Sequence, residues 1–290
     1  MSKEVVERTR SILAAYDPAD PRPTAALLRE LWLEFEPKSI EVIKAEQRKE
    51  QETAGTPVPV LRAIGRELAR DARKRPADIL PLATLLWYEF GREGRVVGLV
   101  PMGAIELADP EGTLSLLIEM CRTCVTWEDA DRLAMNALEP IVRKDPETWL
   151  RALDPWLADS NKWVRRAGVT AAGRLPMKHS AYTKRCVAMA EMLLYDTEVD
   201  VRRAVSFALR LSARGDPKPV RQLLERSVPP DDASATWVLC DVVRSMTKTL
   251  LPHFRSLLPL YEEWSRDPEL SAREQRSVES AVKVLGKAGG

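Results

Sequence analysis

The chain has 290 residues, of which 45% are hydrophobic and 30% charged, a globular balance that fits one extended repeat array or two ordinary domains. The formal net charge of +1 points to no particular partner, so a nucleic-acid-binding protein of this composition would have to concentrate its positive charge on one face. No segment approaches the run of about 18 apolar residues that a membrane helix needs, and no signal-peptide core is evident near the N-terminus, so we expect no membrane association.

Apolar residues recur at three- and four-residue spacing in segment after segment, which is the period of a helix. In chain order these segments are 25–35, 58–68, 79–90, 96–107, 133–142, 164–175, 186–194, 201–211, 250–264 and 278–285. Prolines such as Pro146, Pro176 and Pro217 stand in the gaps, where they end helices. Because no strand-length window alternates with period two, the sequence predicts an all-α fold.

An internal repeat indicates how the predicted helices are arranged. Residues 159–167 (DSNKWVRRA) are echoed 37 positions later by residues 196–204 (DTEVDVRRA). This offset is close to the roughly 40 residues of HEAT and armadillo units, whose helix pairs bury their apolar faces only by stacking on one another. We therefore predict an α-α superhelix (solenoid) of HEAT-like helix pairs, forming a single domain over residues 1–290.

Positive charge collects in the second half of the chain. Residues 162–226 contain fourteen basic and six acidic side chains, a net charge of +8 in a molecule of formal charge +1. Stacked repeats would place Arg166 and Arg203 in a ladder on one face, which suits a phosphate backbone. The alternative is that repeat arginines pair with aspartates of the neighbouring repeat, which we expect for Arg165 and Arg202 rather than for Arg166 and Arg203.

Two other clusters are more ambiguous. Trp127 and Asp131 lie four residues apart and would share one helix face, although a lone Trp is usually core and a lone Asp is often a helix cap. Cys121 and Cys124 form a Cys-x-x-Cys pair inside an apolar helical run, with no second pair after it. We therefore predict helix packing for the cysteines, no metal, no cofactor and a reducing, cytoplasmic location.

Several motifs in order resemble one known family. They are residues 126–131 (TWEDAD), 155–167 (PWLADSNKWVRRA) and 201–210 (VRRAVSFALR), with 56–62 (TPVPVLR) and 86–95 (LWYEFGREGR) upstream. Together they resemble the bacterial DNA-alkylation-repair glycosylases built of HEAT-like repeats, the AlkD type. The likeness covers residues 55–227, and residues 231–290 would add one or two further helix pairs.

This resemblance implies an enzyme that holds duplex DNA in a basic concave groove and excises N3- or N7-alkylated purines. Asp131 matches the family's catalytic carboxylate, Trp127 an aromatic residue beside it, and Arg166 the arginine of the same cleft. Phe207 stands where the family has another tryptophan, which keeps a π face but loses the indole N–H donor. The implied scheme uses the carboxylate and the aromatic faces to stabilise positive charge on the deoxyribose.

We predict DNA contacts on the basic segment at Arg166, Lys162, Trp163, Arg203 and Arg210. The expected partner is double-stranded DNA, alkylated or structured, bound by a monomer. Two alternatives remain open. One is a non-catalytic relative that binds damaged or branched DNA by shape, which the Phe207 departure and the additional C-terminal helices favour. The other is a protein-binding HEAT scaffold whose arginines are structural.

Overall fold

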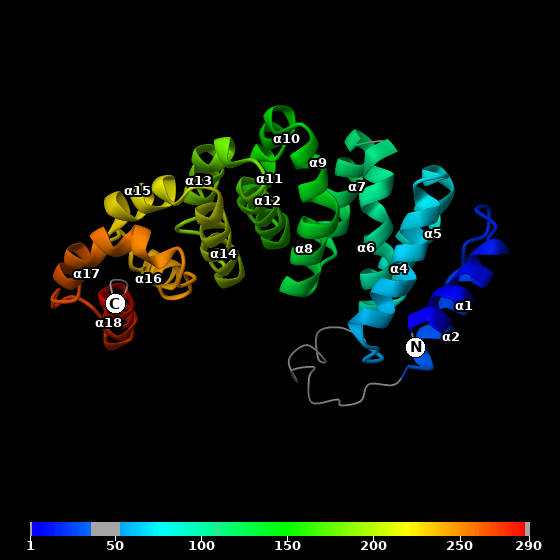
Figure 1. Cartoon of the computed structure of the whole chain (residues 1–290), viewed down its shortest axis with the longest axis horizontal. Helices are drawn as coiled ribbons and strands as arrows, with labels where there is room; N and C mark the ends of the chain where they lie inside the picture. The colour runs from blue at the N-terminus through cyan, green and yellow to red at the C-terminus, as the bar shows by residue number, and fades with distance from the viewer. Residues whose placement is uncertain (1, 36–52, 109, 288–290) are drawn as a thin grey trace. The chain divides into compact units, whose positions relative to one another are not determined.

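The computed structural model describes residues 2–35, 53–108 and 110–287, shown as coloured ribbon in Figure 1. All regular structure in these ranges is helical, so the predicted all-α class is confirmed. None of the helices described there is long and apolar enough to cross a lipid bilayer. Contacts divide the chain into two compact units, Met1–Ile141 and Val142–Gly290, which are described separately below as unit 1 and unit 2.

Unit 1 is built from helices that pack against their neighbours in the chain. Its elements are α1 (Ser2–Ala14), α2 (Arg22–Leu33), α4 (Val58–Ala72), α5 (Pro76–Glu89), α6 (Gly91–Ala108), α7 (Pro110–Arg122), α8 (Trp127–Leu133) and the π-helical turn η2 (Ala134–Leu138). Helix α6 packs against both α4 and α5. The apolar residues at three- and four-residue spacing, such as Leu61, Ile64 and Leu68 on α4, are fully buried and form the core.

Helices α5 and α6 approach closely because α6 presents glycines to α5. A Cβ added to Gly94 would lie 2.3 Å from the carbonyl oxygen of Leu86, and one added to Gly98 would lie 2.5 Å from that of Ala83. Side chains at these two positions would push the helices apart. The close contact fixes the start of α6, which carries two arginines that bear on the candidate site.

Unit 2 continues the succession of helices. After α9 (Glu139–Lys144), which contains the boundary, its elements are α10 (Pro146–Ala152), α11 (Asp154–Leu157), α12 (Lys162–Arg174), the 3-10 turns η3 (Leu175–Met177) and η4 (Ser180–Tyr182), α13 (Thr183–Glu191), α14 (Val199–Gly215), α15 (Pro217–Ser227), η5 (Ala233–Ala235), α16 (Thr236–Arg244), η6 (Leu251–Leu257), α17 (Leu258–Trp264) and α18 (Ala272–Gly286). Helix α12 packs on α14, α14 on α16, and α16 on α18.

The repeat seen in the sequence is also a repeat in structure. The Nη1 atom of Arg165 donates to the carbonyl oxygens of Asp159 and Ser160, at 2.8 and 3.1 Å. Nη1 of Arg202 makes the same two bonds one repeat later, to the carbonyl oxygens six and five residues before it. Each of these arginines therefore closes the loop that precedes its own helix. The predicted pairing with an aspartate of the neighbouring repeat is confirmed for Arg165, which binds Asp196, but the described residues give Arg202 no such ion pair.

Helices α12 and α14 touch at Gly173. A Cβ at this position would lie 2.4 Å from the Cβ of Ala208 and 2.5 Å from its Cα. The added Cβ would clash with the backbone of α14, so no change of side-chain rotamer can make room for it. Glycine at 173 therefore sets the spacing between the two helices that carry the DNA contacts predicted in unit 2.

Replacing Gly173 by Ala is expected to lower the free energy of unfolding by about 1–3 kcal/mol, because overpacking forces a backbone shift. Urea denaturation measures the effect. The matched control is Gly286→Ala near the end of α18, where an added Cβ has nothing within 4 Å and should change stability little. Equal destabilisation by both substitutions would contradict the close-contact explanation.

Candidate functional site

The segment around Trp127 and Asp131 folds into the short helix α8. Thr126 caps this helix, its hydroxyl accepting from the backbone N–H of Asp129 at 3.3 Å. Trp127 is the first helical residue and is 47% exposed, whereas Asp131 is 8% exposed. The two lie one turn apart on the same side of the helix, and the π-helical turn η2 follows directly. A partly exposed indole thus accompanies a buried carboxylate on the same helix.

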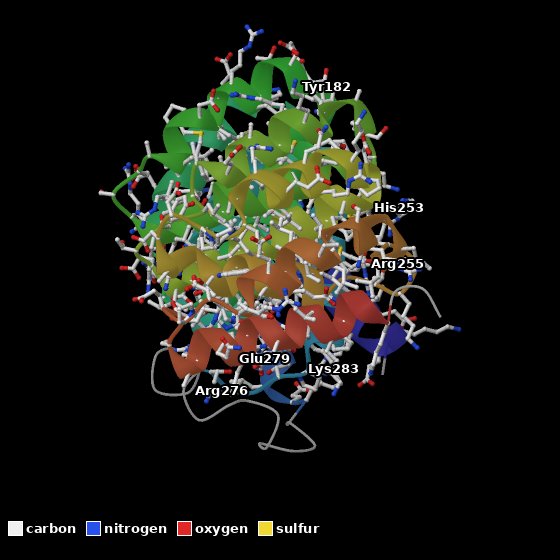
Figure 2. The ribbon with its side chains drawn as sticks, turned by 90° about the vertical axis from the view of Figure 1, so that its left-hand side faces the viewer. Tyr182, His253, Arg255, Arg276, Glu279 and Lys283 are labelled. Carbon is white, nitrogen blue, oxygen red and sulfur yellow. The ribbon has the colours of Figure 1, made fainter. Side chains whose placement is uncertain are left out.

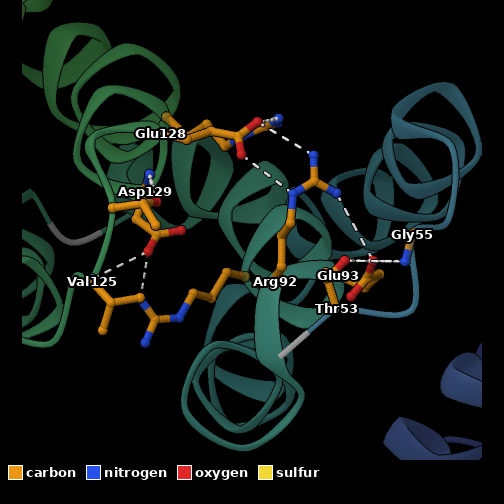
Figure 3. Close-up of polar contacts among 10 residues, drawn as sticks. Thr53, Gly55, Arg92, Glu93, Val125, Glu128 and Asp129 are labelled. Atoms are coloured by element: carbon orange, nitrogen blue, oxygen red, sulfur yellow. Dashed lines mark hydrogen bonds and ion pairs between the residues drawn. The ribbon is translucent and has the colours of Figure 1, made fainter. Parts of the chain in front are cut away.

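An ion-pair network, shown in Figure 3, holds α8 against α6. The carboxylate of Glu128 accepts from Nε of Arg92 at 3.3 Å and also from the guanidinium of Arg132. All three side chains are less than 20% exposed. Burial acts to raise the pKa of Glu128, but the two arginines outweigh it and the pKa is lowered. Glu128 therefore stays charged at neutral pH and clamps the helix between two cations.

A second pair ties the loop before α8 to α6. Nη1 of Arg95 lies 2.8 Å from Oδ2 of Asp129, and Nη2 donates to the carbonyl oxygen of Thr123 at 3.0 Å. The same guanidinium sits over the ring of Trp87, 4.8 Å from its centre. The backbone N–H of Val125 donates to Asp129 at 3.4 Å. These contacts fix the residues immediately before Trp127.

The network reaches the segment before α4. Nη1 of Arg92 lies 3.9 Å from Oε1 of the buried Glu93. That oxygen accepts from the hydroxyl of Thr53 at 2.7 Å and from the backbone N–H of Gly55 at 2.9 Å. Gly55 has a φ of 78°, in the region that favours glycine. Sequence reasoning missed this network, although Arg92 and Glu128 both stand inside the motifs that carried the resemblance.

Replacing Glu128 by Gln is expected to lower the free energy of unfolding at neutral pH by about 1–2 kcal/mol, because two partly buried arginines lose their counter-ion. The pKa of Glu128 is lowered in the folded protein. Its charge therefore contributes above the ordinary pKa of about 4.3 and is lost as the pH falls through the folded-state value. Urea denaturation at neutral and acidic pH should show that the difference in free energy of unfolding between the wild type and Glu128→Gln becomes smaller on acidification. A difference that stays constant with pH would contradict the ion-pair role.

A basic hollow lies beside α8 in unit 1. Its volume is about 210 Å³, and its lining includes Arg62 and Arg66 of α4, Arg132 of α8 and Asn136 of η2. The side chains of Arg62 and Arg66 are exposed. Arg62 stands in one of the motifs that resemble the family, whereas Arg66 is a residue that the motifs do not include. Both arginines offer phosphate contacts on the same unit as Asp131.

Helix α12 carries three of the predicted DNA contacts. Its cap is Asn161, whose side chain accepts from the N–H of Trp163 at 2.8 Å. Nζ of Lys162 lies 3.0 Å from Asp200 and 4.5 Å from the centre of the Trp163 ring. Partial burial acts to lower the pKa of Lys162, but the carboxylate of Asp200 raises it overall. Arg166 is only 5% exposed and donates to the backbone carbonyl of Asp200.

Helix α14 carries the other three predicted residues in a stripe. Arg203, Phe207 and Arg210 are spaced by four and three positions and so share one face, called here the α14 stripe. The side chain of Arg203 is 59% exposed, with Asp200 3.9 Å away. The guanidinium of Arg210 lies 5.9 Å from the centre of the Phe207 ring, and burial lowers its pKa. Arg203 is thus the most accessible cation of the stripe.

The predicted site residues therefore form two groups. Trp127 and Asp131 lie together on α8 of unit 1, and the remaining six lie on the packed helices α12 and α14 of unit 2. Arg165 pairs with Asp196 of the following repeat, through bonds of 2.6 and 3.0 Å, as expected for a structural arginine.

The cysteines Cys121 and Cys124 are both buried, as predicted. In residues 2–35, 53–108 and 110–287, no three His, Cys, Asp or Glu side chains are grouped to hold a metal ion.

Two solved structures resemble this chain in fold. The protein smu.31 from Streptococcus mutans UA159 has a TM-score of 0.50 and 17% identity, over 66% of this chain and 99% of that one. AlkD2 from Streptococcus mutans has a TM-score of 0.51 and 16% identity, over 65% and 98% of the two chains. At such identities the likeness concerns the fold alone. No curated protein matches the sequence.

A family model identifies the chain more directly. The model described as DNA alkylation repair enzyme matches residues 27–239. This range begins upstream of residue 55, where the sequence resemblance began, and it includes α8, α12 and α14 with all eight predicted site residues. It ends within α16, so most of the last three helices lies beyond it. The chain belongs to the DNA alkylation repair enzyme family.

Proposed function

We propose that the protein is a DNA glycosylase that excises N3- or N7-alkylated purines from duplex DNA. The observation that carries the proposal is the pairing on α8 of a 47% exposed indole, Trp127, with the carboxylate of Asp131, inside the region matched by the family. The network of Arg92, Glu128 and Arg132 supports it, because a catalytic carboxylate must be held in place before the substrate arrives.

The proposed reaction breaks the bond between C1′ of the deoxyribose and the purine nitrogen. An N3- or N7-alkylated purine carries positive charge, so it departs with the bonding electron pair as a neutral base and needs no general acid. Positive charge develops on the sugar, where the Asp131 carboxylate stabilises it. Water then adds to C1′ and loses a proton, leaving an abasic site. The face of Trp127 packs on the sugar and favours its cationic character.

Unit 2 holds the DNA backbone in this proposal. Arg203, Lys162 and Arg210 supply positive charge from α12 and α14, and Trp163 lies beside Lys162. Arg166 is buried and bound to the carbonyl of Asp200, so we propose that it acts mainly by shaping the surface that the phosphates meet. We further propose that residues 1–290 act as a single repeat domain and monomer on double-stranded DNA. The four buried free cysteines support a reducing, cytoplasmic setting.

The test is to incubate the purified protein with methylated duplex DNA and to quantify free 3-methyladenine and 7-methylguanine. Release of either base above the rate without protein is the expected result. Well-folded protein that binds this DNA but releases neither base would rule out the glycosylase.

A second candidate is a non-catalytic protein that recognises damaged or branched DNA. The contact between Arg210 and the ring of Phe207 favours it, because a π face already engaged by a cation is less available to a deoxyribose. In that case binding to DNA junctions should exceed binding to plain duplex and should not change with Asp131→Asn. A further outcome separates the two candidates: Phe207→Trp should raise base release only if the site is catalytic.

A further inference from the structure

A charged pocket lies in the C-terminal part of unit 2, mostly beyond the family-matched range. It has a volume of about 470 Å³ and lies between the start of α16 and the first turns of α18. Four arginines line it, one on α14, one at the end of α16 and two on α18: Arg202, Arg244, Arg273 and Arg276. Its size falls in the range of about 300–1,000 Å³ typical of ligand pockets. We call it the C-terminal pocket.

The repeat explains why Arg202 faces this pocket without an ion pair like the one that Arg165 makes. In the preceding repeat, Arg165 binds two loop carbonyls and also the carboxylate of Asp196 in the next repeat. Arg202 binds the equivalent two carbonyls. One repeat on, 37 positions after Asp196, the chain has Ala233 in place of an acid. The carboxylate that forms the ion pair in the preceding repeat is missing at this position, and Ala233 lines the pocket instead. The neighbouring Asp232 does not line the pocket; its pKa is lowered mainly by hydrogen bonds from Ser234, and the charge of Arg202 is the smallest cause.

The other arginines leave the pocket with surplus positive charge. Arg244 has a loose pairing with Asp241, at 3.5 Å. Arg273 and Arg276 have no acidic partner within 4.0 Å among the described residues of unit 2. The single acidic residue of the lining is Glu274. Its carboxylate accepts from the backbone N–H of Ser271 at 2.8 Å. Four arginines around one cavity, including two without an ion pair among the described residues, are an arrangement that recognises an anion.

The pocket also has an aromatic wall and hydroxyl groups. Trp237, on the first turn of α16, lines it together with Ser234 and Ser277. The first turn of α18 lies at its edge and adds the positive end of a helix dipole. A phosphate alone would leave the Trp237 face unused, and the acidic side chains of a peptide have no ring that could stack on it. A nucleotide unit offers both an anion for the arginines and a base for the indole.

We propose that the C-terminal pocket binds a phosphate of a nucleic-acid strand with the adjacent base stacked on Trp237. The site uses no residue of α8, α12 or the α14 stripe. The proposed binding at this pocket can therefore be tested independently of the proposed glycosylase activity. It gives the chain a second contact for a single-stranded or frayed segment of DNA.

The experiment measures binding of a short, unmodified single-stranded deoxyoligonucleotide to the full chain by fluorescence anisotropy at several salt concentrations. The pocket variant is Arg273→Gln with Arg276→Gln. The matched control is Lys248→Gln with Arg255→Gln, which removes the same charge from exposed residues that do not line the pocket. Figure 2 shows Arg276 on α18 well apart from Arg255 on η6. Thermal unfolding verifies that both variants are folded.

The pocket variant should bind about tenfold more weakly and lower the slope of log affinity against log salt by about 1–2, while the control stays within about twofold. Trp237→Leu should weaken binding about tenfold with the salt slope unchanged, because stacking carries no charge. Hydrogen exchange should show protection of residues 233–237 and 271–277 by the oligonucleotide. Equal losses in the pocket and control variants would overturn the proposal. Protection of these residues by inorganic phosphate but not by the oligonucleotide would overturn it too.

Discussion

Asp131→Asn is expected to slow the release of 3-methyladenine and 7-methylguanine by about 10²–10³-fold, the usual cost of removing one preorganised electrostatic group. The carboxylate is 8% exposed and sits one turn from the exposed Trp127. Its negative charge is what the proposed reaction uses, and asparagine keeps the shape while removing that charge. Single-turnover release from methylated duplex measures the effect, and binding to unmodified duplex should change by less than about threefold.

The matched control lies two residues earlier on the same helix. Asp129→Asn makes the same chemical change, but Asp129 pairs with Arg95 at 2.8 Å and receives the N–H of Val125. We expect it to lower the melting temperature while leaving the single-turnover rate of the folded protein within about tenfold. If Asp129→Asn abolished release as fully as Asp131→Asn, the assignment of the charge to Asp131 would be wrong.

Arg203→Glu is expected to weaken binding to duplex DNA by tenfold or more, which corresponds to ~1.4 kcal/mol per factor of ten. Arg203 is the most exposed cation of the α14 stripe, with 59% of its side chain accessible. Reversing its charge replaces an attraction to phosphate by a repulsion. The slope of log affinity against log salt should fall by about 1–2, as measured by a salt titration of anisotropy.

Lys218→Glu provides the comparison for this charge reversal. Lys218 is exposed and lies on α15, outside the α14 stripe, so the net charge of the chain changes equally. Binding should weaken by less than threefold. Similar losses of affinity in both variants would mean that unit 2 attracts DNA through the overall charge of its basic segment and not through a specific face.

Much of the fold follows from periodicity and the internal repeat. The segment 201–211 lies inside α14, and the echo of residues 159–167 in 196–204 reappears as the shared carbonyl bonds of Arg165 and Arg202. The segment 250–264 was expected to be one helix, but the structure has a 3-10 helix followed by α17. Pro259 would lie in the interior of a continuous helix and lacks the N–H that such a helix needs there, whereas Pro252 would lie in its first turn, where proline is tolerated.

The directions of individual side chains are harder to predict from the sequence than the helices are. Arg166 and Arg203 occupy equivalent repeat positions, yet Arg166 is 5% exposed whereas 59% of the Arg203 side chain is accessible. Arg166 reaches the backbone of the next repeat at Asp200, and no motif reports such a contact. The ion pairs of Arg92 and Glu128 join residues 36 positions apart, a separation that local periodicity does not reveal.

The most direct test of the glycosylase is the product balance on a duplex that carries a single 7-methylguanine. With enzyme in excess, we predict one free 7-methylguanine and one abasic site for each substrate consumed, and both products formed about 10²–10³-fold more slowly with Asp131→Asn. Substrate consumed without free base, or a guanine restored in the intact strand, would contradict the proposed bond cleavage.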